Sequence, residues 1–345
     1  MRSTVLAGTD RRARGLASSY VLGTGWVVLA GVMAVSLAAG PIPQRYQFAP
    51  LLVSVLLLGL PHGAVDHLVA PRQLGERLSA RWLGVVGGVY LVLGAAYGVV
   101  WFLWPVAAFA FFILLTWFHW GQGELYPMFE FADTGYLRAA GQRALTVLVR
   151  GAAPMLLPLV AFPGEYEFVA ASLVGLFDPA AADALAPLFK TEARLLVAGL
   201  YGLGALATLG LGYLRAADRG PWLLDAGEVG LLTAFFLLVP PILAIGVYFC
   251  VWHSLRHISR AVFLDEQSVR ALERGRIASV VWRFARDAAP MTAGALALLG
   301  GLYLLVPETP RGTADLVALY LVLIAVLTLP HVAIVTWLDR AQGVL

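Results

Sequence analysis

Long apolar stretches separated by short polar connections run through almost the whole chain. A helix that crosses the hydrocarbon core of a bilayer needs about 20 mostly apolar residues. The pattern predicts ten such spans, at residues 20–40, 48–70, 82–103, 105–125, 145–162, 195–214, 222–239, 241–259, 290–305 and 314–338. We therefore expect an all-α, polytopic integral membrane bundle that forms one transmembrane domain over residues 1–345, with a short basic segment at residues 1–19.

Proline marks two of the predicted turns, at Trp104-Pro105 and at Pro240-Pro241. Proline suits the first turn of a helix, because the N–H that it lacks would be unpaired there in any case. The alternative is one kinked helix across each proline. A single helix over residues 222–259 would be much longer than a bilayer of about 30 Å requires, so we expect a turn at both places.

The composition supports a membrane protein and excludes several other classes. Apolar and aromatic residues make up 60% of the chain, charged residues only 13%, and the mean hydropathy is +0.80. Soluble domains carry about 25% charged residues. This chain has too few charged residues to cover the surface of a soluble enzyme of its size. The same composition excludes a disordered protein and a nucleic-acid binder. The single cysteine, Cys250, excludes a disulfide framework and thiolate-rich metal sites.

The basic residues, 23 arginines and one lysine, predict the orientation of the spans. If the N-terminus is cytoplasmic, most arginines of the connections fall on the inside, and the outer connections hold only Arg45, Lys190, Arg194 and Arg311. This is the positive-inside asymmetry, and it requires a turn at both prolines. We therefore expect both termini in the cytoplasm and a multi-pass protein of the cell membrane.

All six histidines lie on spans two, four, eight and ten: His62, His67, His119, His253, His257 and His331. Under this topology these spans all run from outside to inside. At a rise of about 1.5 Å per residue, all but His67 lie in one layer, roughly 18–26 Å from the outer surface. Ionisable residues in a bilayer normally face the bundle interior and mark function.

A histidine layer of this kind is typical of a metal or cofactor site. His253 and His257 are four residues apart, on one face of a helix, which suits two ligands of one ion. Imidazole binds Zn, Cu, Fe or Ni. A lone membrane histidine is more often a hydrogen-bonded packing residue, but five at one depth favour the metal or cofactor site.

Acidic and aromatic residues accompany the histidines. Asp66 and Glu124 are candidates to accept the second N–H of a ligating imidazole, whereas we expect Asp339 to be interfacial and Arg256 to reach the cytoplasmic surface. Six aromatic residues are either ordinary packing or the wall of a cleft for a long apolar ligand: Trp117, Phe118, Trp120, Tyr248, Phe249 and Trp252.

Four short motifs resemble those of the Brp/Blh family of membrane β-carotene 15,15′-dioxygenases. They are Pro61-His62-Gly63-Ala64-Val65-Asp66, His119-Trp120-Gly121, Trp252-His253-Ser254-Leu255-Arg256-His257 and Pro330-His331. The resemblance implies an all-helical polytopic enzyme that uses non-haem Fe(2+) and O2 to cut β-carotene into two retinals. It implies His62, His119, His253 and His257 as iron ligands and His331 in a supporting role. His67 is either a second-shell residue or a ligand in place of another.

On this hypothesis an apolar substrate reaches the site sideways from the lipid bilayer, through an opening near the cytoplasmic half. Retinal could then pass to a rhodopsin. Three alternatives stay open: another membrane iron oxygenase such as a desaturase, hydroxylase or carotenoid ketolase; a non-enzymatic metal or ion transporter; and a protein that binds haem through two histidines.

Overall fold

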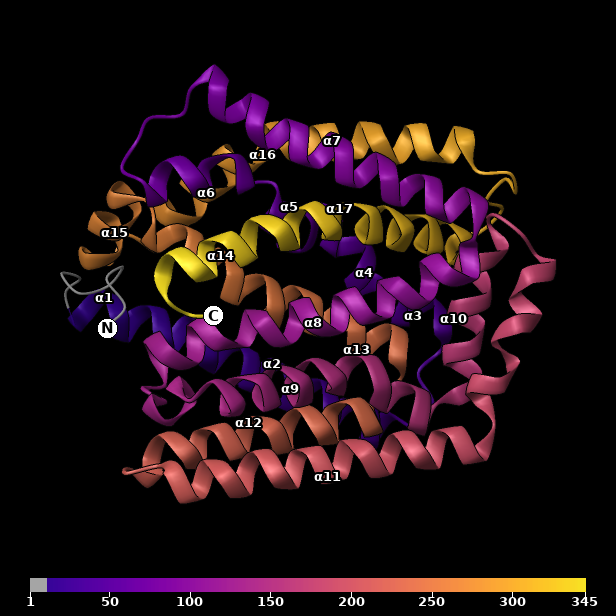
Figure 1. Cartoon of the computed structure of the whole chain (residues 1–345), viewed down its shortest axis with the longest axis horizontal. Coiled ribbons are helices and arrows are strands. Elements are labelled where there is room, and N and C mark those ends of the chain that lie inside the picture. Colours follow the sequence, from indigo (N-terminus) through magenta and orange to yellow (C-terminus); the bar gives the residue numbers. More distant parts are fainter. Residues whose placement is uncertain (1–10) are drawn as a thin grey trace.

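A computed structural model describes residues 11–345, and within this range helices joined by short connections make up the fold, without a strand (Figure 1). The first half contains α1 (Arg11–Ser18), η1 (Ser19–Gly23), α2 (Thr24–Ala39), α3 (Gln44–Gln47), α4 (Ala49–Ser54), α5 (Gly59–Gly63), α6 (Asp66–Gln73), α7 (Ala80–Leu103), α8 (Pro105–Phe131), η2 (Gly135–Arg138) and α9 (Ala140–Ala161). The second half contains α10 (Pro163–Gly175), η3 (Ala180–Phe189), α11 (Thr191–Arg215), α12 (Arg219–Leu238), α13 (Pro241–Val247), η4 (Tyr248–Ser254), α14 (Leu255–Phe263), α15 (Glu266–Glu273), α16 (Ile277–Leu305) and α17 (Thr313–Gln342).

Nine helical stretches of the described chain are long and apolar enough to cross a membrane. They are Ala13–Ala39, Gln44–Gln73, α7, α8, α9, α11, α12, α16 and α17. The predicted all-α, polytopic membrane bundle is thereby confirmed. The first ten residues of the basic segment expected at residues 1–19 lie outside the described range.

The stretch predicted as the eighth span, residues 241–259, is not among the nine. Its helix is nevertheless unbroken, because α13, η4 and α14 follow one another directly from Pro241 to Phe263. The π-helix η4 lies in the middle, and two histidines and two arginines within η4 and α14 make this stretch less apolar than the others. The stretch therefore places polar side chains inside the bundle, where the neighbouring helices surround them.

The second predicted span is interrupted, which the sequence pattern did not indicate. α4 ends at Ser54, and the chain then turns through Leu58, whose φ of 59° is unusual for a residue with a side chain. At Gly59 a Cβ atom would lie 2.5 Å from the Ser54 Cβ and 2.8 Å from a ring carbon of Phe249. Only glycine leaves room for this close approach, and α5 begins there.

Both proline turns are confirmed. α7 ends at Leu103 and α8 begins at Pro105, while α12 ends at Leu238 and α13 begins at Pro241. The connection after α9 differs from the expected loop, because it contains α10 and η3. With 13 residues, α10 extends only about 20 Å, too short to cross a bilayer, and it buries Leu173 and Val174 against its neighbours.

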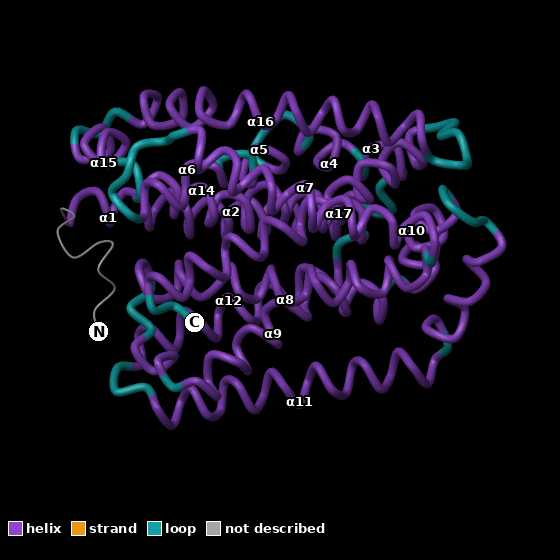
Figure 2. Tube along the Cα trace, turned by 45° about the horizontal axis from the view of Figure 1, so that its top comes forward, coloured by secondary structure: helices purple, strands orange, loops and turns teal. Residues whose placement is uncertain are grey.

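The long helices run side by side along the long axis of the molecule, with α11 on one side of the bundle and α16 on the other (Figures 1 and 2). The most apolar 18-residue windows of α9 and α17 are 67% and 61% buried, which makes these two helices the centre of the bundle. The corresponding windows of α7 and α16 are only 11% buried. These two helices therefore present most of their apolar side chains outward, as helices that face lipid do.

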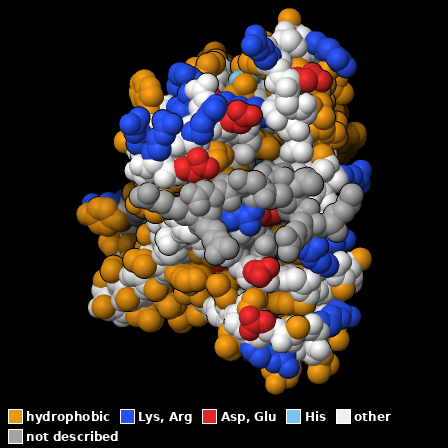
Figure 3. All heavy atoms as spheres, turned by 90° about the vertical axis from the view of Figure 1, so that its left-hand side faces the viewer, with side chains coloured by type: hydrophobic (Ala, Val, Ile, Leu, Met, Phe, Trp, Pro, Cys, Tyr) orange, Lys and Arg blue, Asp and Glu red, His pale blue; other side chains and the backbone are white. Residues whose placement is uncertain are grey.

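α1, α15 and the end of α17 lie at the same end of the bundle, on the left of Figure 1. Viewed directly, this end gathers arginine side chains, drawn in blue, with a smaller number of acidic ones (Figure 3). The described chain therefore starts and finishes at this end of the bundle. Which end faces the cytoplasm stays a prediction from the arginine pattern.

Two glycines allow α8 and α9 to cross in close backbone contact. A Cβ atom at Gly121 on α8 would overlap the Val147 carbonyl oxygen, and one at Gly151 on α9 would overlap the carbonyl oxygen of Trp117. Small residues at a membrane helix interface permit such close approach. Because helices surrounded by lipid gain no hydrophobic stabilisation when they associate, van der Waals contact between them holds the interface together. The glycine of the His119-Trp120-Gly121 motif is therefore a packing requirement.

The crossing predicts a specific loss of stability for Gly151→Ala. The added methyl group meets backbone atoms that cannot rotate away, so we expect the free energy of unfolding to fall by about 1–3 kcal/mol. Thermal unfolding in detergent measures this. Gly141→Ala, on the same helix with open space around its Cα, is the matched control, and equal melting temperatures for the two variants would contradict the crossing.

Candidate metal centre

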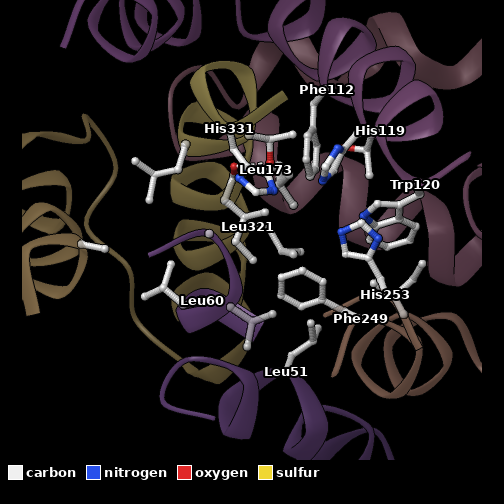
Figure 4. Close-up of a pocket in the computed structure, with 18 of the residues that line it drawn as sticks. Leu51, Leu60, Phe112, His119, Trp120, Leu173, Phe249, His253, Leu321 and His331 are labelled. Atoms are coloured by element: carbon white, nitrogen blue, oxygen red, sulfur yellow. Dashed lines mark hydrogen bonds between the residues drawn. The ribbon is translucent and has the colours of Figure 1, made fainter. Parts of the chain in front are cut away.

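Five histidines from five separate segments meet in one layer of the bundle. His62 comes from α5, His119 from α8, His253 from η4, His257 from α14 and His331 from α17. Ring nitrogens of the first three lie within 4.8 Å of one another. Rings in contact across the whole group have centroids 4.5 to 5.6 Å apart. Figure 4 shows that His119, His253 and His331 are turned toward one cavity.

The π-helix η4 presents the two histidines of the third motif. His253 is the penultimate residue of η4 and His257 lies in the first turn of α14, with ring centroids 4.5 Å apart. Single π-helical turns inside α-helices are frequent at functional sites. The pair shares one face, as its spacing predicts.

The broken second span delivers His62. α5 is only five residues long, and the Nδ1 atom of His62 contacts the carbonyl oxygen of Gly59 in the same turn. A carbonyl only accepts, so Nδ1 must carry the hydrogen of this bond. The lone pair of Nε2 then faces the other imidazoles and is free to bind an ion.

A carboxylate supports His331 in the same way. Asp66 Oδ2 lies 2.8 Å from His331 Nδ1 and also accepts a hydrogen bond of 2.7 Å from the Tyr90 hydroxyl. Metal-binding histidines commonly donate their second N–H to a carboxylate, which fixes the ring and leaves the other nitrogen as the ligand. Asp66 was expected near His62, but it is His331 that it orients.

Seven ring nitrogens of the layer are buried and have no hydrogen-bond partner among residues 11–345. They are Nε2 of His62, both nitrogens of His119, both nitrogens of His253, and Nε2 of His257 and His331. Buried polar atoms almost always have a partner, so a group of seven without one needs a reason. An ion that takes several of these lone pairs at once supplies it.

The spacing of the nitrogens agrees with one shared ion. Two imidazole nitrogens that bind the same ion at about 2.1 Å can lie at most about 4.2 Å apart, close to the 4.8 Å within which the triad falls. Imidazole is a ligand for iron, copper, nickel and zinc alike. His62, His119 and His253 could therefore hold a metal, with His257 and His331 beside them.

Two residues expected near the metal contact other groups. The Nδ1 atom of His67 contacts the carbonyl oxygen of Ala64 at 3.0 Å, and its ring is not among those in contact within the layer. Glu124 is 1% exposed and forms ion pairs of 2.7 Å with Arg150 and with Arg256, so its oxygens are used there.

Glu124 belongs to a buried ion network beside the histidine layer. Arg150 also contacts Asp225 at 2.7 Å and Glu228 at 2.8 Å, and Arg256 contacts Glu228 at 2.6 Å. Tryptophan and tyrosine side chains donate the remaining hydrogen bonds, among them Trp252 to Glu124. A buried charge is tolerated only when it is paired and hydrogen-bonded, as all five charges here are.

The ion network fixes α8 against α14 next to the site. Arg256 lies between the two histidines of its motif in sequence and stacks over the Trp252 ring at 4.0 Å. Gly123 precedes Glu124, and a Cβ atom there would lie 2.5 Å from His257 Nε2. The glycine therefore makes room for the imidazole while the neighbouring carboxylate binds the arginine.

Two expectations from the sequence are wrong here. Arg256 does not reach the surface, because it is 1% exposed and paired with two glutamates. Asp339 is not interfacial, because it is fully buried and lies 2.6 Å from Arg260.

Three members of the ion network, Arg150, Asp225 and Glu228, were not singled out from the sequence. The available signal was their position inside predicted spans, where charged residues are rare and functional.

A cavity of about 730 Å³ adjoins the histidines (Figure 4). Its lining is mostly apolar, and its polar lining residues include His62, His119, His253 and His331 of the layer together with Asp66 and His67. Lining residues of α7 and α16 include Leu83, Met291 and Leu298, which are 43%, 43% and 57% exposed. The cavity therefore reaches the outer surface of the bundle between these two helices. This volume is typical of a small-molecule site.

Of the six aromatic residues proposed for a cleft, Trp120 and Phe249 line this cavity. The other four do not. Phe118 is 40% exposed on the outside of α8, and Trp117 donates to the Leu148 carbonyl oxygen of α9 at 2.7 Å. Tyr248 and Trp252 are fully buried behind the histidine layer. These four residues take part in helix packing and do not form the cavity wall.

Comparison with known proteins identifies the family of this chain. The sequence model of the family described as beta-carotene 15,15'-dioxygenase matches residues 53–339, which include all six histidines. The chain belongs to the β-carotene 15,15′-dioxygenase family. It is thereby an oxidoreductase of the dioxygenase type, and the resemblance seen in the four motifs is confirmed.

Curated relatives of this β-carotene 15,15′-dioxygenase family match over nearly the whole chain. A probable beta-carotene 15,15'-dioxygenase Blh of Halobacterium salinarum is 45% identical over 97% of this chain and 96% of its own length. A probable beta-carotene 15,15'-dioxygenase Brp of the same species is 32% identical over 92% of this chain and 91% of its own length. No solved structure matches the chain.

Replacing His253 by alanine should abolish metal binding, because it removes one of the three nitrogens closest to one another. The metal content of purified protein, measured by elemental analysis after exposure to Fe(2+), gives the result. His67→Ala is the matched control: it removes a buried imidazole outside the layer and should bind as much metal as the wild type. Equal metal content in both variants would contradict the assignment.

Arg150→Met should destabilise the protein strongly, because three carboxylates lose a shared partner in a buried place. Breaking a buried ion network in this way costs about 3–5 kcal/mol, which thermal unfolding in detergent will detect. Arg143→Met, at the start of the same helix, removes an arginine outside the ion network and should change stability little. A variant at position 150 as stable as that control would show that the ion network contributes nothing.

Proposed function

We propose that this chain cleaves β-carotene at its 15,15′ double bond with O2 to give two retinals, at an Fe(2+) ion held by the histidine layer. The names of the family and of its Halobacterium relatives supply the reaction. The residues that form the site in this chain support the same reaction.

One observation carries the proposal: four histidines whose ring nitrogens include unpartnered ones line one wall of a mostly apolar cavity. A hydrocarbon without polar atoms can fill such a cavity at no cost in lost hydrogen bonds. It then meets a metal-binding group only where the histidines lie. The place of reaction is thus set by where the polyene crosses the layer.

The chemistry requires few protein groups. One C=C bond and one O=O bond break, each carbon receives one oxygen atom, and two aldehydes form, so atoms and electrons balance without a further reductant. Ferrous iron, when bound by neutral imidazoles, supplies positions at which O2 is activated.

The protein's own part is to position the double bond and to keep the site dry. Phe249 and Trp120 lie against His253, with ring centroids at 6.1 and 5.5 Å, and form the wall next to it. Asp66 keeps the ring of His331 in one orientation. Together they leave a narrow, rigid slot in which a flat polyene can lie across the nitrogens.

The geometry favours this reaction over the alternatives that the sequence left open. A two-iron desaturase or hydroxylase needs two complete sets of ligands, whereas the triad falls within a single 4.8 Å group. A metal carrier has no use for a large apolar cavity beside its ion. Access from the bilayer between α7 and α16 suits a substrate that dissolves in lipid, and we expect this protein in the cell membrane.

Expression in a bacterium that makes β-carotene tests the function directly. We expect the orange colour to fade and retinal to accumulate, as measured by chromatography of extracted pigments. His119→Ala, which removes a nitrogen of the triad, should restore the colour and abolish retinal. Retinal formation by that variant at the wild-type rate would refute the metal assignment, and unchanged β-carotene with the wild type would refute the function.

A further inference from the structure

A tyrosine on an outer helix contacts the carboxylate behind His331. The Tyr90 hydroxyl donates a hydrogen bond of 2.7 Å to Asp66 Oδ2, and the same oxygen lies 2.8 Å from His331 Nδ1. Tyr90 comes from α7, Asp66 from α6 and His331 from α17. Three separate helices therefore meet at one carboxylate oxygen beside the histidine layer.

Asp66 is held by these two hydrogen bonds. It is 4% exposed, and among residues 11–345 Tyr90 and His331 are the side chains that hydrogen-bond to it. A buried carboxylate needs such partners, because it has lost its contacts with water. Without the phenol, only the imidazole would hold the carboxylate, which could then rotate about its Cβ–Cγ bond.

The direction of the His331 ring depends on this carboxylate. A carboxylate only accepts hydrogen bonds, so Nδ1 of His331 carries the hydrogen and Nε2 has the free lone pair. This Nε2 atom is buried and has no partner in the described chain. The ring centroid lies 5.0 Å from that of His62 and 4.9 Å from that of His119. Rotation of Asp66 would therefore release a ring that belongs to the layer.

The Tyr90 ring is itself fixed by packing, so its hydroxyl is a well-placed donor. It packs against a cluster of buried apolar side chains from α6, α7 and α17: Val69, Val86, Ile334 and Leu338. It also lines the cavity, whereas the most apolar window of α7 is only 11% buried. Tyr90 thus joins a helix that mostly faces outward to the histidine layer.

We infer that Tyr90 is a positioning residue of the metal centre. Its hydroxyl fixes Asp66, Asp66 fixes the ring of His331, and His331 Nε2 thereby stays turned toward the other imidazoles and takes part in binding the ion. The inference rests on the metal centre of the proposed function. It concerns binding of the ion and does not depend on which substrate is cleaved.

Tyr90→Phe tests this role, because it keeps the ring and removes only the donor. We expect the Kd for Co(2+), used as a spectroscopic substitute for Fe(2+), to rise about tenfold, the lower end of what loss of a group behind a metal ligand costs. Titration of purified metal-free protein in detergent, followed by the visible absorption of bound Co(2+), measures this Kd.

Tyr97→Phe is the matched control on the same helix. Tyr97 is 2% exposed, its hydroxyl donates to the Ala108 carbonyl oxygen at 2.8 Å, and it does not line the cavity. This variant also loses a buried hydrogen bond of a tyrosine, so its melting temperature should fall as that of Tyr90→Phe does. Its Kd for Co(2+) should equal that of the wild type.

A double-mutant cycle shows whether Tyr90 acts through Asp66. Asp66→Ala alone should weaken Co(2+) binding about 10- to 100-fold, and adding Tyr90→Phe to it should cause no further loss. If Tyr90→Phe binds Co(2+) as tightly as Tyr97→Phe, or if its effect is undiminished without Asp66, the inference is overturned and the metal centre stands. If the wild type binds no Co(2+), the metal centre is wrong and the inference falls with it.

Discussion

A polar atom buried among apolar helices must have a partner, and this constraint organises the centre of the molecule. The bundle encloses five charged side chains in one ion network and five imidazoles in the adjacent layer. Nearly all polar atoms of the ion network find partners within it, because each carboxylate meets at least one guanidinium and only Arg256 Nε is left without a partner in the described chain. The imidazoles do not, since seven of their nitrogens meet nothing in the described chain. The contrast separates a structural element from a site that could hold an added ion.

Much of the fold could be predicted from the sequence because bilayer thickness restricts a membrane helix to few lengths. The proline turns followed from the same length argument, and the histidine layer followed from counting residues along spans of predicted direction. Counting residues does not predict the local geometry of the backbone. The break after Ser54 depends on a left-handed residue and a close contact with Phe249, which lies nearly 200 positions away in sequence.

The site was predictable in its ligands and less so in its surroundings. His62, His119 and His253 were expected to meet, whereas the orientation of Asp66 toward His331 required knowledge of which helices are neighbours. Aromatic residues were proposed for the cleft by their proximity in sequence to the histidines. Helical geometry explains why four of the six fall outside it: adjacent residues point in directions about 100° apart, so only some of them share the histidine face.

The short α5 has a consequence for how the protein is assembled. Five residues make few internal hydrogen bonds, so α5 depends on its neighbours for its place in the bundle. An ion bound to His62, His119 and His253 would join this piece to α8 and to the helix from Pro241 to Phe263, and would therefore stabilise the bundle in addition to its chemical role. Without an ion at the histidine layer, we expect the bundle to loosen first at this corner, next to the opening of the cavity between α7 and α16.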